Sequence, residues 1–101
     1  MQIVTTDTFD KEVLQSDKPT FVLFTTPSAI KSYLLEEFLG KIDTTKYKAV
    51  KVDVEESYPL NVKYSIRVVP SVWLFSGGIF ISSKTLRDIF KTEDIENMVT
   101  L

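Results

Sequence analysis

The chain of 101 residues contains no cysteine and no histidine. Without thiols it can neither form nor exchange disulfides, and a zinc site would lack its usual ligands. A serine or threonine nucleophile normally needs an adjacent base, most often histidine, so a conventional hydrolase triad is excluded as well. We therefore expect no metal site and no cofactor.

Two further absences concern partners and location. Lysine and arginine number 12 against 14 acidic residues, a net charge of −2, so there is no basic footprint for a nucleic acid. The apolar stretches are too short to span a bilayer, and the N-terminus shows no basic region followed by an apolar block. We expect a cytoplasmic monomer with no membrane or nucleic-acid partner.

What is present fits one domain over residues 1–101, with 44% hydrophobic and 26% charged residues. Residues 20–25 form an apolar run between chain-breaking residues, which predicts a central strand covered on both faces. Apolar spacing predicts a helix over residues 29–42, with Ile30 and Tyr33 among the residues of a broad buried face. Alternation over residues 47–54 predicts the next strand.

The flanking segments complete the pattern. Residues 2–4 predict a short strand, and Thr6 and Asp7 are candidate N-caps for the helix that follows. A short helix is expected within residues 55–64, and Gly77-Gly78 predicts a type I′ turn between two antiparallel strands. Thr92 is expected to cap a closing helix whose inner face holds Ile95, Met98 and Val99. The order predicts an α/β fold: a three-layer sandwich with a central mixed β-sheet flanked by helices.

One segment is more specific than this pattern. Tyr64-Ser65-Ile66-Arg67 is followed by Val68-Val69-Pro70-Ser71, an apolar strand and the glycine turn. This run resembles the signature of the thioredoxin family, and the order of elements over the whole chain is similar to that family too. The resemblance implies the thioredoxin-like fold, a cis proline at Pro70, and backbone groups of Val69 that receive an extended protein or peptide partner.

The same resemblance places the family's redox tetrad at Ala29-Ile30-Lys31-Ser32. Family members use a cysteine at the first position as nucleophile and one at the fourth to resolve the mixed disulfide. Here Ala29 has no nucleophile and Ser32 has only a hydroxyl, so the chain cannot exchange disulfides as written. A register shifted by one residue would pair Ser28 with Lys31 and is equally inert.

Other positions also depart from the family. Thr25 and Ser28 lie where it has tryptophans, and Leu23 replaces a buried acid, which leaves Lys51 without that partner. Asp88 stands in place of a glycine beside the substrate groove, where a charge would alter docking. The resemblance also implies the residues that surround this groove: Pro27, Ser28, Ile30, Val69, Pro70, Asp88 and Ile89.

Several features have plainer interpretations. Pro70 could be a trans residue that begins a strand, Trp73 fits cross-strand packing better than ligand stacking, and Tyr33 fits a partner contact or the helix–sheet seam equally. Asp53, Glu55 and Glu56 suggest solvated carboxylates rather than a metal site. Lys31 and Ser32 are adjacent on a helix and point apart, so a catalytic dyad is not expected.

Two functions remain open from the sequence. In the first, the protein is a thioredoxin-like thiol-disulfide oxidoreductase of cell redox homeostasis, present here in a cysteine-free form. Alanine and serine are also the residues used experimentally to replace cysteine. In the second, the chain is naturally redox-dead and holds a partner in the groove around Val69-Pro70 without chemistry.

Overall fold

The computed structural model describes residues 1–99 of the expected domain; residues 100 and 101 lie outside that range. The strands are β1 (Gln2–Ile3), β2 (Thr20–Thr25), β3 (Lys48–Asp53), β4 (Ser71–Ser76) and β5 (Ile79–Thr85). The helices are η1 (Asp10–Leu14, of π type), α1 (Ser32–Leu39), α2 (Tyr58–Tyr64), η2 (Leu86–Asp88, a 3-10 helix) and α3 (Thr92–Glu96). In residues 1–99 no helix has the length and apolar content needed to cross a bilayer.

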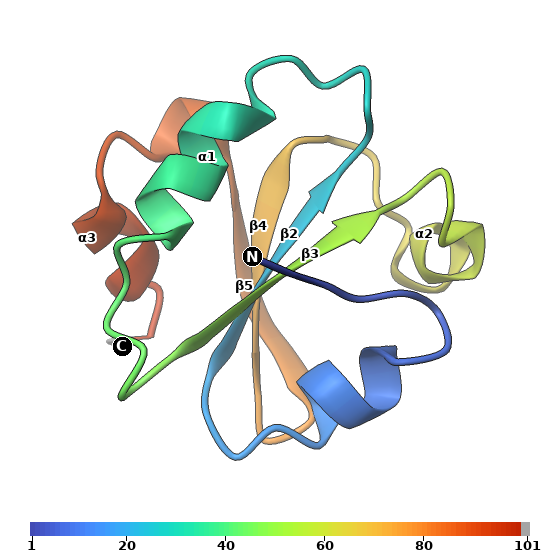
Figure 1. The fold of residues 1–101 in the computed structure, drawn as a ribbon, viewed down its shortest axis with the longest axis horizontal. Coiled ribbons are helices and arrows are strands. Elements are labelled where there is room, and N and C mark those ends of the chain that lie inside the picture. Colours follow the sequence, from blue (N-terminus) through green and yellow to red (C-terminus); the bar gives the residue numbers. More distant parts are fainter. Residues whose placement is uncertain (100–101) are drawn as a thin grey trace.

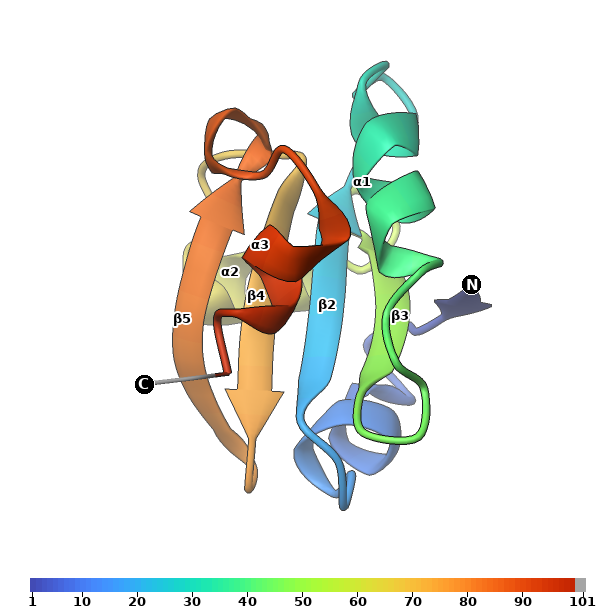
Figure 2. The same cartoon turned by 90° about the vertical axis from the view of Figure 1, so that its left-hand side faces the viewer.

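The strands form one mixed sheet in the order β1-β3-β2-β4-β5. β1, β3 and β2 run parallel, whereas β4 and β5 are antiparallel to their neighbours. Helices α1 and α3 cover one face of this sheet, and η1 and α2 cover the other (Figures 1 and 2). The three-layer α/β sandwich expected from the sequence is confirmed.

β2 is the middle strand of the sheet, and each of its six residues is buried. Its side chains alternate between the two faces and join two separate cores. The core under η1 and α2 contains Val4, Phe9, Val13, Val22, Phe24, Val50, Val52, Val54, Leu60, Ile66 and Phe75. The core under α1 and α3 contains Phe21, Leu23, Leu35, Leu39, Ile42, Val72, Leu74, Ile89, Ile95 and Met98.

Helix α1 is shorter than its apolar spacing predicts. It begins at Ser32 and ends at Leu39. Its start is late because residues 29–31 form turns, in which the Ser32 N–H donates to the Ala29 carbonyl at 3.0 Å. Ile30 therefore precedes the helix and is 84% exposed, and Tyr33 is 60% exposed on the outer side of its first turn. The prediction that Ile30 and Tyr33 belong to a buried helical face was wrong.

The predicted helix caps were also wrong. Neither Thr6 nor Asp7 caps η1, whose preceding turn is closed by Thr8 Oγ1 accepting the Thr5 N–H at 3.0 Å. At α3 the cap is Asp94, whose carboxylate accepts backbone N–H groups from the two residues before the helix. The Thr92 hydroxyl instead donates to the Phe38 carbonyl of α1 at 2.8 Å and joins the two helices.

Candidate functional site

The segments that the resemblance singles out meet at one end of β2. Phe24, near the end of β2, pairs with Ser71 at the start of β4, so the turn after Thr25 lies beside Pro70. The Val69–Pro70 peptide bond is cis. The first residue of α1 lies at the same end (Figure 1). This is the end of an α/β sheet, beyond the last residues of its parallel strands, where ligands usually bind.

At the tetrad, the structure separates the two family cysteine positions by environment. Ala29 lies in the turn, and its N–H donates to the Thr26 carbonyl at 3.1 Å. Ser32 opens α1, is only 7% exposed, and shares a hydrogen bond with the buried hydroxyl of Thr25. Because Thr25 cannot act as a base, this contact holds Ser32 in place without activating it. The Ser32 hydroxyl is therefore structural.

The position of the family's buried acid is filled by an apolar residue. Leu23 is fully buried, and Lys51 stands opposite it on β3. Lys51 Nζ contacts Glu36 Oε1 of α1 at 2.9 Å, with both side chains about one-third exposed. This ion pair gives Lys51 another partner near the surface, and the core beneath it carries no proton acceptor for a thiol at position 32.

Two adjoining pockets are lined in part by the segment that precedes β4, and we call them the Arg87 pocket and the Arg67 pocket. The Arg87 pocket, of about 320 Å³, is lined by Val68, Val69, Pro70, Thr85, Leu86 and Arg87. The Arg67 pocket, of about 200 Å³, is lined by Ser65, Arg67, Val68, Ser71, Trp73, Ser83 and Thr85. Val68 and Thr85 line both, so the two pockets share a wall and form one continuous surface.

The structure gathers only some of the residues expected around the groove. Val69 and Pro70 line the Arg87 pocket, whereas Pro27, Ser28, Ile30 and Asp88 are exposed around the same end without lining it. Ile89 is only 3% exposed and packs in the core under α1 and α3. The expectation that Ile89 helps to surround the groove was therefore wrong, because its side chain is buried in that core.

Arg67, quoted above in the family motif, and Arg87, which belongs with Asp88 and Ile89 to the loop expected beside the groove, carry positive charge into this surface, a role that sequence reasoning gave to neither. Both were visible in the sequence as its only arginines, but nothing in their spacing brings them together. Trp73 is half-buried and packs against Phe24 and Tyr64 at centroid distances of 5.3 and 5.9 Å, which confirms its interpretation as a packing residue. Its Nε1–H donates to Ser71 Oγ at 3.1 Å, so it fixes one wall of the Arg67 pocket.

In the acidic cluster at the end of β3, the Asp53 carboxylate forms hydrogen bonds with the local backbone. Asp53 Oδ1 accepts the N–H groups of Glu55 and Glu56 at 2.9 and 3.3 Å. Within residues 1–99, no group of three acidic, histidine or cysteine side chains is placed to hold a metal ion.

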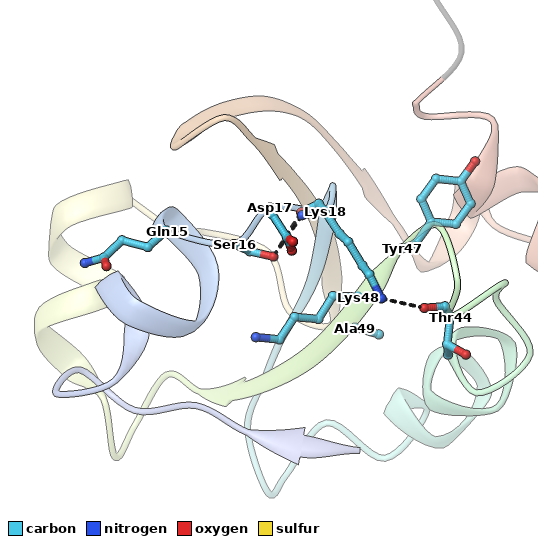
Figure 3. A pocket seen from close by; sticks show the side chains of 8 residues that line it. All are labelled: Gln15, Ser16, Asp17, Lys18, Thr44, Tyr47, Lys48 and Ala49. Atoms are coloured by element: carbon cyan, nitrogen blue, oxygen red, sulfur yellow. Dashed lines mark hydrogen bonds between the residues drawn. The ribbon is translucent and has the colours of Figure 1, made fainter.

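A larger pocket than the Arg87 and Arg67 pockets lies at the opposite end of β2, and we call it the far-end pocket (Figure 3). Its volume is about 620 Å³, and its lining residues are Gln15, Ser16, Asp17, Lys18, Thr44, Tyr47, Lys48 and Ala49. Lys18 Nζ donates to the Thr44 carbonyl at 2.9 Å, and Lys48 Nζ contacts Glu12 Oε2 at 2.7 Å. Both cations are thus held by the protein itself.

Comparison with known proteins gives a consistent result. The family model described as Thioredoxin matches residues 1–100. The chain is similar to "Thioredoxin" of Rickettsia bellii, with 34% identity over 79 residues and 74% of each chain covered. It is also 34% identical over 83 residues to "Thioredoxin 1" of Nostoc sp., covering 74% of this chain and 73% of that protein. "Thioredoxin M-type, chloroplastic" of Chlamydomonas reinhardtii is 34% identical over 79 residues, 74% of this chain and 56% of that protein.

Proposed function

Because this chain belongs to the thioredoxin family, we propose that it is a protein of the thiol-disulfide oxidoreductase type that retains the family's groove for an extended polypeptide. With no cysteine it is redox-inactive as written. The observation that carries the proposal is the surface formed by Val69, Pro70 and the two adjoining pockets before β4. A cytosolic location is part of the same proposal, and fractionation of cells that express the tagged chain tests it.

The groove supports binding through its backbone and its shape. Val69 and Pro70 are half-buried and line a pocket, so an extended segment laid along them would be held partly out of water. Backbone pairing of this kind supplies affinity, and neighbouring pockets for alternate side chains supply selectivity. The partner we propose is accordingly a protein or peptide in extended conformation, bound by the monomer.

The double variant Ala29→Cys/Ser32→Cys tests whether the scaffold is competent for disulfide exchange. A thiolate introduced at position 29 would attack one sulfur of a model disulfide, form a mixed disulfide with it and release the other substrate sulfur as a thiol. The thiol at position 32 would then attack the sulfur at position 29, release the second substrate thiol and leave a disulfide between the two positions. Dithiothreitol would reduce that disulfide and close the cycle. We expect dithiothreitol-dependent reduction of insulin by the double variant and none by the unaltered chain.

The control is the single variant Ala29→Cys, which lacks a resolving thiol and should stall as a mixed disulfide when it is mixed with the model disulfide without dithiothreitol. A double variant that is folded by circular dichroism but has no reductase activity would refute the oxidoreductase proposal. Reading the natural gene at codons 29 and 32 is the companion measurement. Cysteine codons there would identify this chain as a cysteine-free form of a redox enzyme.

A second candidate function, a binding module that never performed redox chemistry, is favoured by the buried Leu23 and by the contact between Thr25 and Ser32. Both changes remove groups that thiol chemistry would use, yet they leave the groove around Val69 and Pro70 in place. Native alanine and serine codons, together with an inactive double variant and preserved peptide binding, would select this function.

A further inference from the structure

The only two arginines of the chain line the two pockets at the proposed groove. Arg67 comes from the segment before Pro70, and Arg87 comes from η2 after β5, 20 positions further along the chain (87 − 67). The ten lysines among the 12 basic residues contribute no side chain to either pocket lining. The fold thus brings both arginines to adjoining pockets that share Val68 and Thr85, next to Val69.

Within residues 1–99, neither guanidinium has an acidic partner. The ion pairs formed within residues 1–99 all use lysines, and neither Arg67 nor Arg87 takes part in a side-chain hydrogen bond there. No carboxylate lines either pocket within the described chain. Asp88 is the neighbouring acid, but it is exposed and its carboxylate contacts the Thr85 hydroxyl at 3.5 Å. The surface is therefore locally cationic on a protein whose net charge is negative.

Hydroxyl groups add neutral donors to this charge. Ser65, Ser71, Ser83 and Thr85 line the Arg67 pocket, and the Trp73 indole already occupies an acceptor site of Ser71. An anionic group in this pocket would accept hydrogen bonds from hydroxyls as well as from the guanidinium. Guanidinium binds carboxylates through two parallel hydrogen bonds, and it remains charged at every physiological pH.

We propose that Arg67 and Arg87 select partners in which aspartate or glutamate residues flank the residue bound at Val69. This inference rests on the proposed function, because it assigns a substrate class to the same groove. In an extended peptide, side chains two residues apart point to the same face, so two acidic residues on either side of the central residue reach toward the two pockets. The negative net charge of the whole protein would repel an acidic peptide, so the attraction must come from the two arginines at the groove.

The experiment uses fluorescein-labelled Thr-Glu-Val-Glu-Thr and its matched forms with two glutamines or two lysines. Fluorescence anisotropy measures their binding to the unaltered chain. Exposed charge pairs contribute modestly, so we expect the glutamate peptide to bind about three- to tenfold more tightly than the glutamine peptide, and the lysine peptide to bind most weakly. Raising the salt concentration should reduce the difference between the glutamate and glutamine peptides.

Arg67→Gln and Arg87→Gln should each reduce the preference for glutamate while leaving binding of the glutamine peptide unchanged. Lys46→Gln removes the same charge from an exposed position at the other end of the molecule and should preserve the preference. If the glutamate and glutamine peptides bind equally, or if the arginine variants keep the preference, the inference is wrong and the proposed groove stands. If no peptide binds, the proposed groove itself is refuted.

Discussion

The far-end pocket at the start of β2 and the two arginine pockets at its end all contain cationic side chains, but they differ in what those cations contact. In the far-end pocket, Lys18 and Lys48 are bound by the Thr44 carbonyl and the Glu12 carboxylate. In the smaller pockets, Arg67 and Arg87 have no partner within the described chain. Pocket volume is therefore a poor guide to the binding site in this protein, because the cations of the larger pocket already have partners.

The two ends also differ in how their backbone is used. At the far end, the Gly77-Gly78 turn packs close to the Leu14 carbonyl. A hydrogen bond from Lys48 to the Glu12 carbonyl joins β3 to η1 at the same end. At the other end, Val69 and Pro70 line an open pocket. We therefore expect changes at the far end to alter stability without altering peptide binding. Changes to the two arginines should do the opposite.

The largest change in stability is expected at the two buried hydroxyl groups near the groove, those of Thr25 and Ser32. Thr25→Val leaves Ser32 Oγ buried without its partner, which should lower the free energy of unfolding by about 1–3 kcal/mol. Ser32→Ala should also destabilise the protein, whereas the double variant should recover much of the loss because both polar groups are gone. Urea unfolding of the four proteins measures this cycle. Strictly additive losses would contradict a mutual hydrogen bond.

A smaller effect is expected at the far-end turn, where two adjacent glycines make a matched pair. Gly78 has φ of +82°, and a Cβ there would lie 3.2 Å from the Leu14 carbonyl oxygen. Gly77 has φ of +61° with nothing within 4 Å of its Cβ position. Gly78→Ala should therefore cost more than Gly77→Ala, which carries only the backbone penalty of about 1–2 kcal/mol.

Thermal unfolding of the two glycine variants gives the ranking, and the anisotropy assay tests whether the groove is independent of it. Each variant should bind the glutamate peptide as tightly as the unaltered chain at temperatures where it is folded. Weakened peptide binding by a folded Gly78→Ala variant would break the comparison, since it would couple the two ends of the sheet.

Much of the fold could be predicted because local pattern and burial agree. The apolar run of residues 20–25 became β2 with the expected bounds, and the turn at Gly77 and Gly78 has the positive φ angles of a type I′ turn. The predicted helix caps were wrong where a side chain can bond either to its own helix or to a residue distant in the sequence. Thr92 could cap its own helix, but its hydroxyl meets the Phe38 carbonyl once α3 packs on α1.

The candidate site was predicted as far as a motif could carry it. Val69 and Pro70 were found because proline before an apolar strand is visible in one stretch of sequence. Ile89 was misplaced because an apolar residue in a connecting segment can face a groove or a core, and only packing decides which. The pairing of Arg67 with Arg87 required the geometry of β5 and η2, which no local pattern encodes.

The smallest effect tests the far-end pocket through pH. The hydrogen bond from Lys48, followed by one from Gln2, holds the pKa of Glu12 below its ordinary value. Because the pKa is lower in the folded state than in the unfolded one, the charged carboxylate stabilises the fold at neutral pH. That contribution is lost as the pH falls below about 4.

Glu12→Gln should therefore lose less stability than the unaltered chain between neutral pH and about pH 3. Glu37→Gln is the matched control, since it removes the same charge from an exposed pair with Lys41 whose charged atoms are 3.8 Å apart. We expect the control to keep the original acid profile in urea unfolding at each pH. Peptide binding at neutral pH should be the same for both variants, because the carboxylate partner of Lys48 lies at the opposite end of β2 from the arginines. If Glu12→Gln loses as much stability at low pH as the unaltered chain, the contact between Glu12 and Lys48 does not contribute to the acid sensitivity of the fold.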